Sequence, residues 1–392
     1  MSYDLTVYAP GRDIPLDLPA LIASIAGLSV EAADDVETKV RRGAGYSFTV
    51  FGPFRIEPED VPVAAVPHVL EPGLCWQVIV EGSTAAEVPT AVRFAKKLAT
   101  AAEGVAVDEQ SGEPLGTAKF RAVAAPSTGR ASIVQLRWYT PTAGSDPVDG
   151  PRLWLELAES MLPEALPRRF GNVEPFQYRL DRDGEERFYA CFHNEDFSLA
   201  FTTRRPCLSG GLGAARNTPT VCDHLTVLAD PLRDPRWRNT IRRFFIAYAA
   251  RRGAVLATGS ILRDYLVSAG GAASDGTTEN ERTLSAPDGI YGLPPQPVWW
   301  TWLGNAYLDL PGKPRVFPRR KPPPLVRDYL PADATHHYSA GAFYAAAEEP
   351  THRRDLRRRR DPFPAALRST AVPGAYALDD IEAAAIRPMF TV

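Results

Sequence analysis

Residues 224–257 decide the fold, and they read HLTVLADPLRDPRWRNTIRRFFIAYAARRGAVLA. His224 to Ala229 is rich in apolar and β-branched residues, which predicts a strand. Asp234-Pro235 is typical of a helix start, because the aspartate caps the first turn and proline fits within it. The apolar residues behind this start share one helical face: Trp237, Ile241, Phe244, Phe245 and Tyr248. Gly253 ends the predicted helix, and Ala254-Val255-Leu256 begins another strand.

The same order of elements occurs earlier in the chain. Leu74 to Val80 is a compact apolar run that predicts a strand, and Val105 to Val107 predicts another. Between them, Thr84 and Glu87, three residues apart, have the spacing of a capping box. Pro89 follows closely, so the sequence does not fix which residue begins the first helical turn. The helical face that follows consists of Val88, Ala91, Ala95, Leu98 and Ala102, and Gly104 ends the helix.

The remaining elements extend this parallel to two halves. In the first half we predict a strand at Tyr3–Tyr8, a helix start at Asp17-Leu18-Pro19 and a strand at Tyr46–Phe51. In the second half the predicted elements are a strand at Ile133–Tyr139, a helix at Pro151–Leu162, and strands at Phe188–Phe192 and Leu199–Thr203. The fold class is therefore α+β, with two ferredoxin-like (split β-α-β) halves and antiparallel sheets. True duplication and chance similarity of common units both fit the pattern.

The predicted domains are residues 1–128, residues 129–310, and an irregular Pro/Arg-rich C-terminal extension at 311–392. A polar loop from Gly270 to about Asp288 leads to the last strand of the second half, within Val298–Leu303. The two-residue period of a strand places Trp300 and Trp302 on one face and Trp299 on the other. The prolines of Lys313 to Pro331 predict an extended segment, with polyproline II structure at Pro322-Pro323-Pro324.

Composition is that of a globular chain with frequent breaks in regular structure. Of 392 residues, 45% are hydrophobic, 23% are charged and 37 are proline. The formal net charge is −3, which does not favour general polyanion binding, although residues 313–361 hold twelve basic and six acidic residues. We expect no signal peptide, no membrane span and, from four scattered cysteines, a reducing compartment, so the predicted location is the cytoplasm.

Two glycine-rich motifs fall short of known catalytic patterns. Cys207-Leu208-Ser209-Gly210-Gly211 resembles a nucleophile elbow, but Cys207 stands where the first glycine is required. Gly211 to Arg216 lacks the third glycine of a dinucleotide-binding loop, so a glycine-rich turn is the simpler interpretation. The sequence has no Walker A lysine loop and no C-x-x-C pair for zinc, and we predict no cofactor and no metal site.

Three groups of polar residues are weaker catalytic candidates. Cys222-Asp223-His224 contains a thiol, a carboxylate and an imidazole, but a strand would separate Asp223 from its two neighbours. His336-His337-Tyr338 offers imidazoles for metal binding or proton transfer, and an ordinary loop or strand role is the alternative. Glu156 and Glu159 have helical i,i+3 spacing and could pair as acid and base, or be a solvated face.

Binding is the other candidate role, and two clusters could serve it. The first is Trp299, Trp300 and Trp302, which could anchor an interface or fill a core. The second is Arg357-Arg358-Arg359-Arg360, which could bind phosphates or be paired with acids of the same chain. Because the rest of the chain carries a negative charge, we do not expect nucleic acid as the partner.

Leu162–Pro175 (LPEALPRRFGNVEP) and Trp299–Tyr307 (WWTWLGNAY) carry a family resemblance. They resemble segments of poorly characterised bacterial proteins, including some grouped with predicted immunity proteins of polymorphic-toxin and type VI secretion systems. The resemblance spans about residues 130 to 310 and includes no catalytic motif. It implies a cytosolic protein that binds a toxin and blocks it without a cofactor, and it transfers no site residues.

The sequence thus predicts a non-enzymatic protein-binding protein, with an immunity factor as the specific hypothesis. Its surface would use exposed aromatic and charged residues of the second half, and an acidic body would suit a basic toxin. One alternative is a hydrolase whose residues, such as Asp223, His224 or His336, meet only in the fold. Another is a structural component of a larger assembly.

Overall fold

The computed structural model describes residues 2–11, 16–57, 60–62, 65–69, 71–115, 129–141, 149–194, 198–213, 220–267, 272–273, 285–286, 289–290, 293–294, 296–309, 324–359 and 361–363. The chain is α+β, with two large antiparallel sheets. It divides into two compact units. The first comprises Met1–Thr128 with Glu174–Gln177, and the second comprises Gly129–Val173 with Tyr178–Val392.

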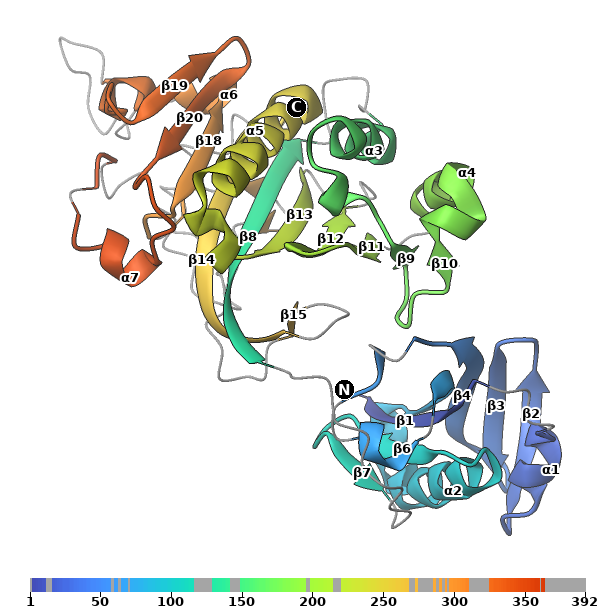
Figure 1. Ribbon diagram of the computed structural model, residues 1–392. Helices are drawn as coiled ribbons and strands as arrows, with labels where there is room; N and C mark the ends of the chain where they lie inside the picture. The colour runs from blue at the N-terminus through green and yellow to red at the C-terminus, as the bar shows by residue number, and fades with distance from the viewer. Residues whose placement is uncertain are drawn as a thin grey trace, which may run out of the picture. The chain divides into compact units, whose positions relative to one another are not determined.

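The first unit is a seven-stranded antiparallel sheet with helices packed on it (Figure 1). Its elements are β1 (Tyr3–Pro10), α1 (Leu18–Ala23), β2 (Leu28–Ala33), β3 (Glu37–Arg42), β4 (Gly45–Arg55), β5 (Pro72–Val80), α2 (Val88–Ala101), β6 (Val105–Asp108) and β7 (Glu113–Leu115). The strand order is β2-β3-β4-β5-β1-β6-β7. Since β5 and β6 both pair antiparallel with β1, helix α2 joins two strands that enclose a third, which is a split β-α-β unit.

Helix α2 buries the predicted apolar face, but its start and end differ in detail from the prediction. Ala91, Ala95 and Leu98 are buried against the sheet. No capping box forms, because Thr84 lies in a short 3₁₀ turn and Pro89 stands in the first turn of a helix that begins at Val88. At the other end, a Cβ atom on Gly104 would lie 1.9 Å from the carbonyl oxygen of Tyr8, so the glycine permits a close approach to β1.

The second unit has the same arrangement around its own central strand. Its first elements are β8 (Gly129–Pro141), α3 (Gly150–Met161), β9 (Arg169–Gly171), β10 (Tyr178–Arg179), α4 (Leu180–Asn194), β11 (Leu199–Thr202), β12 (Cys207–Leu212), β13 (Thr220–Leu228), α5 (Pro235–Arg252) and β14 (Leu256–Val267). Strands β13 and β14 flank β8, both antiparallel to it, and α5 connects them. The two units therefore share the order of their core strands, β2-β3-β4-β5-β1-β6 and β9-β11-β12-β13-β8-β14, although the second unit inserts β10 and α4. Their origin by duplication stays a prediction.

Further strands extend this second sheet beyond β14. They are β15 (Ala272–Ala273), β18 (Trp300–Gly304), β19 (Thr335–Tyr338) and β20 (Gly341–Ala345), with the short helices α6 (Asn305–Leu308) and α7 (Arg353–Leu356) beside them. Strands β16 (Ser285–Ala286) and β17 (Gly289–Ile290) pair only with each other. The sheet runs β10-β9-β11-β12-β13-β8-β14-β18-β20-β19. Part of the predicted irregular extension is thus regular structure, because β19 and β20 lie within residues 311–392.

Helix α5 forms where the sequence predicts it. The Asp234 carboxylate accepts a hydrogen bond from the backbone N–H of Arg236 at 2.8 Å, and Gly253 ends the helix with a positive φ of 72°. Its apolar face, including Phe244 and Tyr248, packs on the sheet beside Trp138 of β8. Figure 1 shows α3 and α5 on the same side of this sheet, and the core lies between them and the strands.

Three predicted features of the second half differ from the structure. Phe188–Phe192 belongs to helix α4 rather than to a strand, because Phe188 and Cys191, three residues apart, are both buried on one helical face. Trp299 precedes β18 and joins the same core cluster as Trp300, so the two rings are not on opposite faces. Val326–Tyr329 forms a 3₁₀ turn, whereas Pro322 and Pro323 lie outside the described residues.

Candidate functional site

The Asp223 side chain, on β13, points towards α5 and is hydrogen-bonded to other buried groups in the core. Its side chain is 0% exposed and accepts hydrogen bonds from the Tyr248 hydroxyl, the Arg252 Nε–H and the Gly213 backbone N–H, each at 2.9 Å. The Arg252 side chain is itself only 7% exposed. Since a buried carboxylate needs such partners, Asp223 has a structural role, tying β13 and β12 to the last turn of α5.

His224 and Cys222 lie on the opposite face of the sheet. Cys222 packs against the apolar cluster that contains Tyr139 and Leu256, and the His224 imidazole lies over Gly211, where a Cβ would approach it to 2.5 Å. Burial, reinforced by the positive charge of Arg137 and partly opposed by Asp223, lowers the pKa of His224 to about 4. The imidazole is thus neutral near pH 7, and Asp223 does not orient it.

The lowered pKa of His224 predicts a specific loss of stability in acid. Its ordinary pKa is 6.5, so below that pH the unfolded chain takes up a proton that the folded chain refuses until about pH 4. We expect His224 to remove up to about 3 kcal/mol of unfolding free energy as the pH falls from 6.5 to 4. Urea unfolding of the wild type and of His224→Gln between pH 6.5 and 4 measures this effect. The difference in unfolding free energy between the two proteins should change with pH. Parallel pH profiles of the two unfolding free energies would disprove the prediction.

The other catalytic candidates are not brought together either. His336 lies on β19, five strand steps from His224, which corresponds to about 24 Å at ~4.8 Å per step. Glu156 forms a bidentate pair with Arg251, with both N···O distances 2.8 Å, and the hydrogen bond from Arg251 lowers its pKa. Burial raises the pKa of the Cys207 thiol, and Ser209 lies within strand β12, next to a shift in its register with β13, rather than on a strand-to-helix turn.

The three predicted binding tryptophans are inside the core rather than on the surface. Trp299 and Trp302 donate their indole N–H groups to the carbonyl oxygens of Ala347 and Ala254, each at 3.0 Å. The Trp299 and Trp300 rings stack with centroids 4.1 Å apart. The reason for the difference is that β18 is not the last strand of its sheet: β14 and β20 flank it on both sides.

The predicted basic run lies at the surface of the same unit. Arg357, Arg358 and Arg359 follow α7 and are exposed, whereas Arg360 lies outside the described residues. Helix α7 is anchored by Leu356, which is buried in the core. Asp355 on α7 pairs with Arg263 at 3.3 Å and with Arg358 at 3.9 Å.

Ala346 is hydrogen-bonded to one residue of each cluster, Trp299 and Arg359. Its backbone N–H donates to the carbonyl oxygen of Trp299 at 2.9 Å, and its carbonyl oxygen accepts from Arg359 Nη1 at 3.4 Å. A small pocket opens here, which we name the Arg359 pocket. It is lined mainly by Leu293, Pro294, Pro297, Val298, Thr301, Tyr344, Ala346, Leu356, Arg359, Asp361, Pro362 and Phe363.

A further feature, not predicted from the sequence, is the outer edge of β19. Each other strand that ends a large sheet carries a charge, a proline or a bulge: Glu31 and a register shift in β2, Glu113 and Pro114 in β7, and Arg179 in β10. Such features prevent unwanted pairing of sheet edges. Strand β19, Thr-His-His-Tyr, pairs with β20 in unbroken register and has no Asp, Glu, Lys, Arg or proline. Among the described residues, no strand pairs with its other side.

Aromatic side chains accompany this edge. Tyr338 is 44% exposed and packs against Trp302, with ring centroids 5.8 Å apart. His336 stacks on Phe343, and His337 is also exposed. The turn after Tyr338 is held in place, because the Asn305 side chain donates to the Ser339 carbonyl oxygen at 2.9 Å. The edge is therefore presented by a fixed hairpin.

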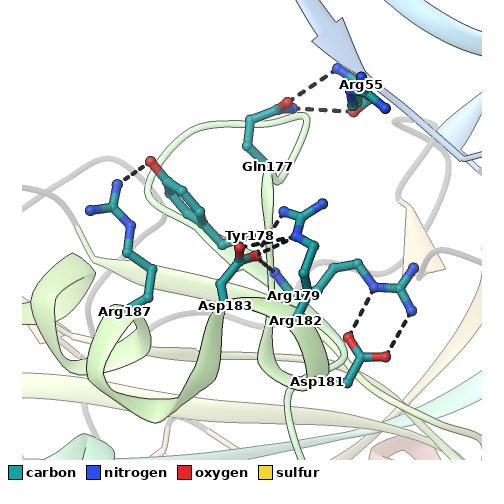
Figure 2. A network of polar contacts seen from close by, with 8 residues as sticks. All are labelled: Arg55, Gln177, Tyr178, Arg179, Asp181, Arg182, Asp183 and Arg187. Carbon is teal, nitrogen blue, oxygen red and sulfur yellow. Dashed lines mark hydrogen bonds and ion pairs between the residues drawn. The ribbon is translucent and has the colours of Figure 1, made fainter.

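Charges around β10 and α4, in contrast, are largely satisfied by one another (Figure 2). Arg179 forms a bidentate pair with Asp181 at 3.0 and 3.1 Å, and Arg182 binds Asp183 at 2.7 Å. Arg187 contacts the Tyr178 hydroxyl and lies over its ring. In the first unit, the Gln177 side chain exchanges hydrogen bonds with the backbone of Arg55.

Among the described residues, no group of three or more His, Cys, Asp or Glu side chains is placed to hold a metal ion. Within that same part of the chain, none of the helices has the length and apolar character needed to cross a membrane.

Comparisons with known proteins give one distant likeness to report. No protein-family model matches the sequence, and no curated protein matches it. Among solved structures, the T6SS protein PA0821 of Pseudomonas aeruginosa is similar to this chain with a TM-score of 0.38 and 14% identity. The alignment covers 57% of this chain and 72% of that one. A similarity this low gives no information about the activity of this chain.

Proposed function

We propose that this protein acts by binding another protein, and that an extended segment of the partner pairs with the outer edge of β19. The observation that supports this most strongly is the edge of β19, which has no Asp, Glu, Lys, Arg or proline, whereas each other strand that ends a large sheet in the described part of the chain carries one of these residues or a bulge. An unpaired strand edge recognises polypeptide backbone, so its natural ligand is protein.

The backbone pattern of the hairpin defines which groups are offered. The N–H of Ala345 donates to the carbonyl oxygen of Ala334 at 3.1 Å, so that pair is hydrogen-bonded. Hydrogen-bonded and non-bonded pairs alternate along an antiparallel ladder, which turns the backbone groups of His336 and Tyr338 towards β20. Those of Thr335 and His337 consequently point outward, where a partner strand would meet them.

The partner in this proposal is a toxin that the protein neutralises. Support comes from the resemblance of Leu162–Pro175 and Trp299–Tyr307 to predicted immunity proteins. The hydrogen bonds of Asp223 with Tyr248 and Arg252 also fit a binding role, because a binding protein needs a rigid scaffold and a complementary surface. Tyr338 would supply an aromatic contact beside the paired backbones, as tyrosines commonly do at interfaces.

Replacing His337 by proline tests the proposal. Proline removes the outward N–H of His337 while leaving the ladder to β20 intact, and proline is tolerated on edge strands. We expect partner affinity to fall about 10- to 100-fold, because a buried partner carbonyl would lose its hydrogen bond. The matched control, His337→Ala, keeps the N–H and should bind as the wild type does.

The measurement begins with capture of partners on the immobilised full-length chain from a lysate of its source organism, followed by mass spectrometry. The proposal predicts a protein retained by the wild type and His337→Ala, lost by His337→Pro, and toxic to cells that lack this chain. Capture that His337→Pro leaves unchanged would refute the role of β19. Loss of a self-assembled oligomer in the proline variant, with no other partner, would instead favour a structural component.

A further inference from the structure

Aromatic side chains form a row across the second sheet that ends at the outer edge of β19. The strand register places Trp302 of β18 opposite Phe343 of β20, and Phe343 opposite His336 of β19. Residues directly opposite one another lie on the same face of a sheet, here the face that carries α5. Trp302 and Phe343 are 0% exposed, whereas His336 is exposed. The next place in the row therefore belongs to a strand that pairs with β19.

Two rings of β19 border this next place. The His336 ring stacks on Phe343 with centroids 6.4 Å apart and an angle of 22° between the ring planes. Tyr338 follows two residues later, on the same face, and is 44% exposed where it packs against Trp302. A partner residue opposite His336 would contact the imidazole directly and the Tyr338 ring diagonally.

The backbone pattern brings a side chain at this place close to His336. The outward backbone groups of β19 are those of Thr335 and His337, and β20 pairs with its two neighbours antiparallel. If a partner strand continues that pattern, His336 and the residue opposite it form a non-hydrogen-bonded pair. The Cα atoms of such a pair are about 4.5 Å apart, against about 5.5 Å in a hydrogen-bonded pair, so the side chains are in closer contact.

We propose that β19 selects a partner segment with an aromatic side chain opposite His336, where that side chain extends the row from Trp302 and Phe343. This inference rests on the proposed pairing at β19 and adds the chemistry of the partner. Aromatic pairs across neighbouring strands stabilise a sheet, and they gain more than their buried area alone accounts for.

The charges around the hairpin favour no ionic partner. From Ala334 to Ala347 the chain has no Asp, Glu, Lys or Arg. The charged residues nearest in sequence are Asp333 and Glu348, outside this stretch, and Glu348 lies 3.9 Å from Arg238. Without lysine or arginine, the hairpin also offers nothing to a phosphate backbone, so the exposed rings are better suited to a protein side chain than to stacked bases.

The test selects ligands for the immobilised full-length chain from a displayed library of random ten-residue peptides, which leaves the pairing register free. Peptides that need the edge are those retained by the wild type and lost by His337→Pro. We expect these peptides to share an aromatic residue at one position. In fluorescence anisotropy with the labelled synthetic peptide, alanine at that position should weaken binding about three- to tenfold.

A matched pair of variants locates the contact. His336→Thr removes the ring on the face that carries α5, and His337→Thr makes the same change on the other face. Threonine is favoured in strands, so both variants should keep β19. The aromatic-to-alanine change in the peptide should weaken binding by less than about twofold with His336→Thr, and still about three- to tenfold with His337→Thr.

Three results would overturn the inference. They are equal effects of the two threonine variants, a charged residue in place of the aromatic one among the selected peptides, and a selection that recovers no peptide dependent on β19.

This test is separate from that of the proposed function. If His337→Pro abolishes both partner capture and peptide binding, but the recovered peptides show no aromatic preference, the inference fails and pairing at β19 stands. If the aromatic preference is found as expected while His337→Pro still captures the partner normally, the proposed function fails and the preference of the edge stands.

Discussion

Asp223→Ala is expected to cost the second unit about 3–5 kcal/mol of unfolding free energy. The substitution leaves the Arg252 guanidinium, with its side chain only 7% exposed, beside an empty site in the core. It also removes the acceptor for the Tyr248 hydroxyl and the Gly213 N–H. Removing one member of a buried charge pair is far more costly than replacing both by apolar residues, because the other charge remains buried and unpaired.

Urea unfolding followed by tryptophan fluorescence measures this effect in the right unit, since only one of the seven tryptophans, Trp76, lies in the first. Asp223→Leu combined with Arg252→Met should recover much of the lost stability. Glu156→Ala, which breaks the exposed pair with Arg251, is the matched control and should leave the unfolding midpoint unchanged. An Asp223→Ala variant as stable as the Glu156→Ala control would contradict the structural role of Asp223.

Trp302→Ala should lower the free energy of unfolding by about 3–5 kcal/mol, because the Trp302 side chain is 0% exposed in the core. The change leaves a cavity beneath Tyr338 and deprives the Ala254 carbonyl oxygen of its indole donor. Trp302→Phe should lose less, since the ring volume is partly retained. Both values come from the same fluorescence-monitored unfolding in urea.

The control for Trp302 is Arg357→Ala, an exposed position that should change stability by no more than about 0.5 kcal/mol. The contrast separates core from surface among the residues that the sequence presents as binding candidates. If Trp302→Ala unfolded at the same urea concentration as Arg357→Ala, the placement of β18 inside the sheet would be wrong.

Local signals made the helices α2 and α5 predictable from sequence. Asp234, Pro235 and Gly253 act within one or two turns, so they mark the ends of α5 whatever surrounds it. The strands on either side of each helix follow from short apolar runs. The split β-α-β arrangement could be predicted because these signals recur in the same order in both halves.

Non-local pairing was not predictable in this way. Strand β18 pairs with β20 some forty residues later, beyond a proline-rich stretch, and nothing in Val298–Leu303 announces that second neighbour. The sequence therefore left both a core and an interface role open for the tryptophans there, although they were named as binding candidates. Helix α4 was missed for a different reason, because a five-residue apolar run such as Phe188–Phe192 fits a strand as well as a buried helical turn.

Likewise, only some features of the candidate site could be predicted from the sequence. The sequence singled out Arg357–Arg360 and His336-His337-Tyr338, but only the fold reveals that Tyr338 stands on an unpaired edge and that Arg359 borders a pocket. The separation of Asp223 from His224 was predictable, since alternate strand residues face opposite sides. The engagement of Asp223 with Tyr248 and Arg252 depends on how α5 docks.

Residue-resolved hydrogen–deuterium exchange of β19, with and without the captured partner, tests the central proposal most directly. Pairing of a partner strand should slow exchange of the outward amides of Thr335 and His337, whereas those of His336 and Tyr338, already turned towards β20, should change little. Unchanged exchange at Thr335 and His337 in a saturated complex would contradict it.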